Sequence, residues 1–144
     1  MKVVDANVLL YATNRAAAHH RRALAWWESA LDGDEPVGLP WVSLLAFLRL
    51  STKPEIFPEA LSVAEAGAKV RRWLAQPAVR LIRETDEHAE CLLALLSETG
   101  TAGDLTTDAH IAALAFCRGA TVVSFDGDFS HFPQVRWMVP PPLA

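Results

Sequence analysis

The chain has no long apolar run, no repeat and no strong excess of one charge. Its longest apolar stretch, Leu39 to Leu48, is too short to span a bilayer and ends at Arg49. Asp5 falls where the apolar core of a signal peptide would begin, so we expect no signal peptide and a cytoplasmic protein. Without a low-complexity tract or linker, residues 1–144 are most simply one domain with its own core.

Metal-binding cysteine and histidine patterns are also missing. The two cysteines, Cys91 and Cys117, lie in apolar helical patterns, where we expect small reduced core residues rather than a disulfide or a metal site. The five histidines show no metal-ligand spacing, which argues against zinc. A Ser-His-Asp hydrolase is not indicated either, because there is no Gly-x-Ser-x-Gly motif.

The net charge of −4 gives no general attraction to nucleic acid. A nucleic-acid substrate is still compatible with it if an acidic cleft holds a metal and cations lie nearby. Six side chains are candidates for such local cations, although we interpret them first as exposed helix faces. They are Arg15, Arg21, Arg22, Lys69, Arg71 and Arg72.

Hydrophobic residues make up 51% of the chain, and they alternate between strand and helix patterns. Strands are predicted at residues 2–4, 37–39, 79–82, 121–124 and 135–138. Helices are predicted at 7–12, 19–31, 42–50, from a capping box at 62–65 to before Pro77, from Asp86 to about 97, and at 105–118. This alternation favours a parallel sheet that is covered by helices on both faces.

Four aspartates lie where an α/β chain does not bury a charge without a reason. Asp5 ends the first apolar strand and Asp126 ends a later one, while Asp104 and Asp108 stand four apart at the head of an Ala-rich helix. Ligands bind beyond the carboxyl ends of parallel strands. Acids gathered there repel one another unless a cation lies among them, and a divalent metal is the simplest such cation.

Some of these acids also have purely structural interpretations. Asp104 can be the N-cap of the following helix, and Asp126 can begin a turn with Gly127. Asp128, which we rank below the other four, can cap the turn at residues 129–131. Asp108 lies one turn inside a helix, at the edge of the buried stripe predicted at Leu105, Ala109, Ala112 and Phe116, so no capping role explains it.

Four stretches, in order along the chain, carry a family pattern: residues 3–9, 39–54, 103–115 and 119–129. Together they resemble the PIN-domain ribonucleases, and in particular the toxins of VapBC toxin–antitoxin pairs. The likeness covers essentially the whole chain. It implies a single PIN domain, a PIN-like three-layer α/β/α sandwich around a central, mainly parallel sheet of about five strands. It also implies RNA cleavage that depends on Mg²⁺ or Mn²⁺.

The resemblance also implies roles for particular residues. Asp5, Asp108 and Asp126 match the metal-binding acids of the family, and Ser124 matches a small hydroxyl residue that can hold a water or a carboxylate.

The chain departs from the family at one position, where a glutamate usually lies three residues before an arginine such as Arg49. This chain has Ala46 there, and Asp104 is the nearest substitute for the missing acid. The missing glutamate affects the expected number of bound metal ions and the expected catalytic rate.

The function expected from these features is that of a metal-dependent endoribonuclease, the toxin of a type II toxin–antitoxin pair, with tRNA or rRNA as substrate. Hydrolysis would use a water activated by a metal among the aspartates. The resemblance implies a cognate VapB-type antitoxin, whose tail lies over the acids with an arginine or similar group. It also implies a homodimer and no membrane association.

Two alternatives stay open at this point. A PIN-fold protein-binding module with weakened catalysis is credible because of Ala46, and because one of the adjacent Trp26 and Trp27 can face a partner. A metal-dependent phosphatase of the haloacid-dehalogenase type also begins with an aspartate after its first strand. That family needs a second aspartate two positions later, where this chain has Asn7.

Overall fold

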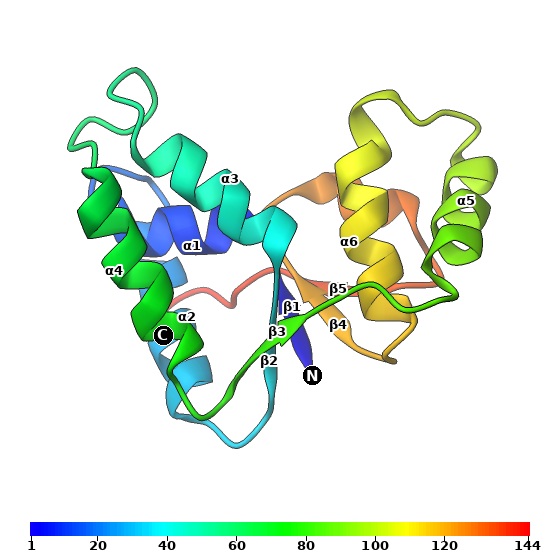
Figure 1. Cartoon of the computed structure of the whole chain (residues 1–144), viewed down its shortest axis with the longest axis horizontal. Coiled ribbons are helices and arrows are strands. Elements are labelled where there is room, and N and C mark those ends of the chain that lie inside the picture. Colours follow the sequence, from blue (N-terminus) through cyan, green and yellow to red (C-terminus); the bar gives the residue numbers. More distant parts are fainter.

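The computed structural model of the chain describes residues 1–144 and builds them around one parallel sheet (Figure 1). The five strands lie in the order β3-β2-β1-β4-β5, and every neighbouring pair is parallel. They are β1 (Lys2–Val4), β2 (Val37–Pro40), β3 (Val79–Ile82), β4 (Thr121–Val123) and β5 (Arg136–Met138). The predicted five-stranded parallel sheet is therefore confirmed.

Helices cover both faces of the sheet, in three layers that Figure 1 shows with the sheet between them. One face carries α1 (Ala6–Thr13), α2 (His20–Asp32), α3 (Trp41–Ser51) and α4 (Val63–Leu74), and the other carries α5 (His88–Thr99) and α6 (Thr106–Phe116). Each face has its own core, of 15 and 14 buried residues. The predicted α/β/α sandwich is confirmed. No helix is long and apolar enough to cross a membrane.

Aromatic side chains fill the larger of the two cores. The Trp73 ring meets Phe47 edge-on at 4.7 Å between centroids, and meets Trp27 at 5.7 Å. Trp27 is buried, whereas its neighbour Trp26 is partly buried and stacks on it at 6.3 Å. The two adjacent tryptophans thus divide between the core and its edge.

Two local expectations for the second face were wrong. Asp86 does not cap α5, because a turn closed by the His88 N–H and the Thr85 carbonyl comes first and the helix begins at His88. Phe116 was expected in the buried stripe of α6 and Cys117 in the core, but both are exposed. The reason is that α6 packs against β1, β4 and α5 together, so its apolar residues 111–115 are all buried, whereas the residues that follow them lie beyond these contacts.

The order of the strands leaves an open site at one edge of the sheet. From β1 the chain runs outward to β2 and then β3, and it later returns to the other side of β1 with β4 and β5. Val4 pairs with Val123, so the residues that follow β1 and β4 emerge side by side. This reversal point, beyond the carboxyl ends of the strands, is where open α/β sheets bind ligands.

Replacing Phe47 tests the aromatic core. Phe47→Ala should destabilise the fold by about 3–5 kcal/mol, because the side chain is fully buried against Trp73 and its removal leaves a cavity. Urea unfolding measures this. The matched control is Leu45→Ala on the same helix, which is 59% exposed and should change stability by no more than about 0.5 kcal/mol.

Candidate metal centre

Asp5 follows β1 directly and has its carboxylate held on several sides. Its Oδ1 accepts a hydrogen bond of 2.7 Å from the Ala6 N–H, at the start of α1. Its Oδ2 accepts bonds from the Ser124 hydroxyl at 2.6 Å and the Asn7 amide at 3.2 Å. Burial raises the pKa of this carboxyl above its usual value, while the bonds from Ser124 and Ala6 lower it and the charge of Asp126 raises it.

Ser124 and Asn7 tie the end of β4 to the start of α1. The fully buried Ser124 hydroxyl donates to Asp5 and accepts from the Asn7 amide at 3.0 Å and the Asp126 N–H at 3.0 Å. The Asn7 Oδ1 in turn accepts from the Phe125 N–H at 3.1 Å. Asn7 was missed as a site residue. An Asp-x-Asn spacing was the available signal, but only the folded chain shows what the amide contacts.

Three carboxylates converge beside this network. Oxygens of Asp108, Asp126 and Asp128 lie within 4.8 Å of one another. Asp108 comes from the first turn of α6, while the other two flank Gly127 at the 3₁₀ helix η2 (Gly127–His131). The structure thus gathers acids from elements that are far apart in the sequence.

The pKa of Asp108 reflects its burial and its repulsion by the neighbouring acids. Burial first, and then the negative charges of Asp126, Asp5 and Asp128, raise it from 3.8 to about 7. The carboxyl of Asp108 therefore interacts with both Asp5 and the other two acids. A cation placed among these groups would relieve the repulsion.

The five acids named in the sequence take different positions. Asp104 lies in the 3₁₀ helix η1 (Gly103–Leu105) with an exposed side chain, outside the group of three carboxylates. It is not the N-cap of α6, which is Leu105. The turn that Asp128 was expected to cap is capped by Asp126, whose Oδ1 accepts from the Asp128 N–H at 2.9 Å. This bond brings the Asp128 carboxylate towards Asp126 and Asp108.

These residues fit a hard divalent cation. All the converging groups are carboxylates, which are the ligands that magnesium and manganese prefer, and no thiolate or imidazole joins them. Asp108 and Asp126 are partly buried and Asp128 is exposed, so the group is open to solvent and to a substrate. Ala46, on α3, offers no ligand, so the glutamate missing from the sequence has no replacement on that helix.

Two histidines that are distant in sequence, His88 of α5 and His110 of α6, contact each other. His88 Nε2 lies 2.9 Å from His110 Nδ1, and His110 Nε2 lies 3.4 Å from Glu84 Oε1. Burial, and then the charge of His88, lowers the pKa of His110, whereas Glu84 raises it. Because α6 carries both His110 and Asp108, this contact with α5 supports the helix that presents Asp108.

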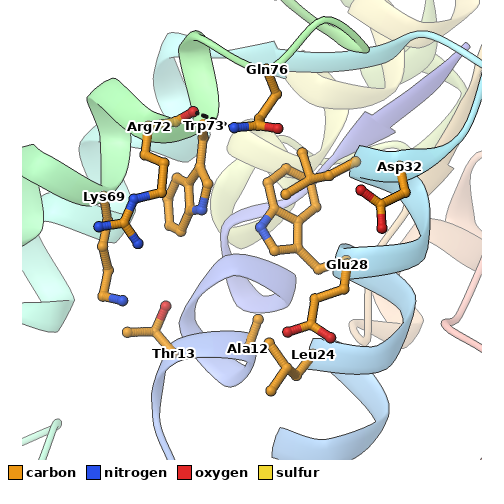
Figure 2. A pocket seen from close by; sticks show the side chains of 11 residues that line it. Ala12, Thr13, Leu24, Glu28, Asp32, Lys69, Arg72, Trp73 and Gln76 are labelled. Carbon is orange, nitrogen blue, oxygen red and sulfur yellow. Dashed lines mark hydrogen bonds between the residues drawn. The ribbon is translucent and has the colours of Figure 1, made fainter.

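A separate cavity of about 410 Å³ lies between α1, α2 and α4 (Figure 2). Trp27 and Trp73 line it, and Figure 2 shows Lys69 and Arg72 facing Glu28 and Asp32 across it. Its two acids come from one helix and do not form a metal-binding group.

The chain matches a known protein family and several curated relatives. The model of the PIN domain family matches residues 2–135, and the chain therefore belongs to the PIN-domain family, as the sequence motifs indicated. Within the family it is similar to VapC proteins. It is 48% identical over 143 residues to "Ribonuclease VapC37" of Mycobacterium tuberculosis, covering 99% of each chain. It is 39% identical over 140 residues to "Ribonuclease VapC33" of the same organism, covering 97% of this chain and 98% of the relative.

Solved structures share the fold at low sequence identity. The chain matches VapBC2 from Rickettsia felis, solved bound to a promoter DNA fragment, with a TM-score of 0.70 at 16% identity, covering 96% of this chain and 97% of that one. It also matches VapC20 of Mycobacterium tuberculosis, described as a Sarcin-Ricin loop cleaving toxin, with a TM-score of 0.66 at 23% identity. That match covers 94% of this chain and 99% of the other. With the family established, the phosphatase alternative is set aside.

Replacing Ser124 tests the hydrogen-bond network. Ser124→Ala should destabilise the protein by about 1–3 kcal/mol, because the Asn7 amide and the Asp126 N–H lose a buried acceptor. Thermal and urea unfolding measure this. Ser130→Ala, at an exposed serine of η2, is the matched control and should leave stability nearly unchanged. Equal effects of the two changes would contradict the role given to Ser124.

The pKa of Asp108 predicts how metal binding depends on pH. Because the folded protein keeps a proton on Asp108 up to about pH 7, a cation must displace it below that pH. The apparent Mn²⁺ affinity should thus rise by up to about tenfold per pH unit below 7 and level off above it. Without metal, the raised pKa makes the contribution of Asp108 to stability fall as pH rises from about 4 to 7.

Calorimetric titration with Mn²⁺ from pH 5.5 to 8.5 measures this dependence, in buffers of different ionisation enthalpy that reveal proton release. Asp108→Asn should bind Mn²⁺ more weakly and without the step near pH 7. An affinity in the unchanged protein that is flat across this range would contradict the prediction.

Proposed function

We propose that this chain is a metal-dependent endoribonuclease that acts as the toxin of a type II toxin–antitoxin pair. The observation that carries the proposal is the cluster of carboxylates at the reversal point of the sheet, in a chain that matches a VapC ribonuclease at 48% identity along its length. We propose that residues 1–144 act as one PIN domain. The substrate is RNA, with tRNA or rRNA preferred.

The acids proposed from the sequence are Asp5, Asp104, Asp108 and Asp126, of which Asp104 lies outside the group of converging carboxylates. We propose Mg²⁺ as the cofactor and Mn²⁺ as a substitute. Oxygen-only ligands support these two ions over zinc. When bound, the cation supplies an acidified water and positive charge against the phosphate. We add Asp128 to the proposed acids, because its carboxylate lies with those of Asp108 and Asp126.

The side chains of the protein have separate tasks in this proposal. Asp108 from α6, with Asp126 and Asp128 at η2, would hold the cation, because their carboxylate oxygens lie within 4.8 Å of one another. Asp5 adds its charge from the end of β1, and Ser124 with Asn7 holds that carboxylate in one orientation. No side chain attacks the phosphate, since the nucleophile is water. The protein therefore contributes position and charge rather than a covalent intermediate.

The toxin role implies partners. We propose a cognate VapB-type antitoxin whose tail lies over the acids, where a cationic group can take the place of the metal charge. The cavity between α1, α2 and α4 can receive an apolar side chain of the same partner, because Trp27 and Trp73 line it and charges of both signs lie around it. We also propose a homodimer, and a cytoplasmic location because tRNA and rRNA are found there.

Cleavage of a total tRNA and rRNA pool by the purified chain, free of partner, tests the proposal. Discrete fragments should form with Mg²⁺ or Mn²⁺ and not with EDTA. Asp5→Asn and Asp108→Asn should each lower the rate by about 100-fold or more, because each removes a charge that the cation needs. A folded chain that cuts no RNA and binds no Mn²⁺ would instead support the protein-binding module.

A second pair of variants identifies which acid takes the role of the glutamate that the family has at the position of Ala46. Asp104→Asn and Asp128→Asn both remove one exposed carboxylate near the same helix end. We expect the larger loss of rate from Asp128→Asn, because only Asp128 lies with Asp108 and Asp126. A larger loss from Asp104→Asn would restore the assignment made from the sequence. Fragment quantification at one metal concentration distinguishes the two.

A further inference from the structure

A group of aromatic rings adjoins the hydrogen-bond network around Asp5, because the Phe125 N–H donates to Asn7 Oδ1 and the Asn7 amide donates to Asp5. Phe125, partly buried, is the residue between Ser124 and Asp126. The His19 ring stacks on it at 4.8 Å between centroids with planes 12° apart, and the Tyr11 ring meets it at 5.2 Å. The His19 ring is the exposed member of the group, so it offers an aromatic surface to solvent.

A cation completes this group. The guanidinium carbon of Arg22 lies 5.4 Å from the centre of the Phe125 ring, within the range of a cation–π contact. The Arg22 Nε donates to the Pro140 carbonyl, which fixes the side chain there. The Phe125 backbone is fixed too, since its N–H donates to Asn7 Oδ1. Rings and cation are thus held in place before any substrate arrives.

Helix formation does not explain His19. It occupies the N-cap position of α2, where serine, threonine, aspartate or asparagine usually accepts a bond from the first turn. The His19 side chain makes no such bond and stacks on Phe125 instead. Tyr11 and Phe125 pack on the core beneath, whereas His19 does not belong to that core. Its ring is therefore free to serve a ligand.

We infer that the His19–Phe125 stack, with Tyr11 and Arg22 around it, binds an unpaired nucleobase of the RNA next to the phosphate that is cut. The inference rests on the proposed ribonuclease function and names the form of RNA recognised there. Bases of single strands stack on aromatic side chains, while bases inside a duplex have no free face. Phe125 precedes Asp126 in the chain, and its N–H is bonded to Asn7, which also bonds Asp5. We therefore expect the bound base to belong to a nucleotide near the reacting one.

The charge of the protein makes such a contact useful. With a net charge of −4 and acids at the centre, phosphates gain little from long-range attraction. Stacking adds affinity that does not depend on the phosphate charge, and Arg22 places one cation against the strand at the same point. The site thus favours loops and unpaired segments over helical RNA.

Variants of His19 test the inference. His19→Ala, and His19→Gln as a second change without a ring, should raise the KM for tRNA cleavage about tenfold with kcat within about twofold, because a stacking contact is lost. His19→Phe keeps an aromatic ring on Phe125, so its KM and kcat should stay near those of the unchanged protein. Phe116→Ala removes an exposed aromatic ring at the opposite end of α6 and is the control that should change neither constant. Thermal unfolding of each variant confirms that it is folded.

Binding gives a second readout. Anisotropy of labelled oligouridylate in Ca²⁺ should show about tenfold weaker binding by His19→Ala, and the same strand annealed to its complement should bind weakly to every variant. Unchanged KM and binding in both ringless variants, equal binding of single strand and duplex, or no binding by the unchanged protein would each overturn the inference. Absence of metal-dependent cleavage by the unchanged protein would overturn the proposed function instead, so the two failures are distinguishable.

Discussion

The hydrogen bond from the Ser124 hydroxyl to Asp5 joins the ends of the two central strands, and the arrangement of the site depends on it. It holds a buried carboxylate that burial alone would drive towards protonation. The same hydroxyl accepts from the Asp126 N–H, and Asn7 bonds to both Ser124 and the Phe125 N–H. One short network therefore sets the position of an acid on β1, of another after β4, and of the aromatic ring between them.

Repulsion among the acids is the second constraint. Burial and three neighbouring carboxylates raise the pKa of Asp108 to about 7, so the folded chain carries an electrostatic cost that a divalent cation would reduce. Sites with strongly perturbed acids are often functional for this reason. The same acids would repel an RNA substrate, and in the proposal a bound cation and the stack of His19 on Phe125 offset that repulsion.

The sequence pattern predicted the elements correctly where burial depends on residues that are close together in the chain. Short apolar runs predicted all five strands, and helical spacing predicted the six helices, with ends within about two residues. It failed where burial comes from several neighbours at once. The pattern predicted Phe116 and Cys117, at the end of α6, to be core residues, but both are exposed. It also predicted Asp128 to cap a turn that Asp126 caps instead. Single-helix periodicity cannot represent a helix that is packed on several sides.

By itself, the sequence determined the fold class and the family, because alternating strands and helices and the ordered Asp motifs are local properties of the chain. It also placed Asp5 and Asp126 at strand ends, where parallel sheets bind ligands. Only the tertiary structure decided which acids converge, bringing Asp128 to Asp108 and leaving Asp104 outside, and only it joined His19 to Phe125. Those contacts link residues up to about a hundred positions apart, and their distances follow from strand order and helix packing rather than from spacing in the chain.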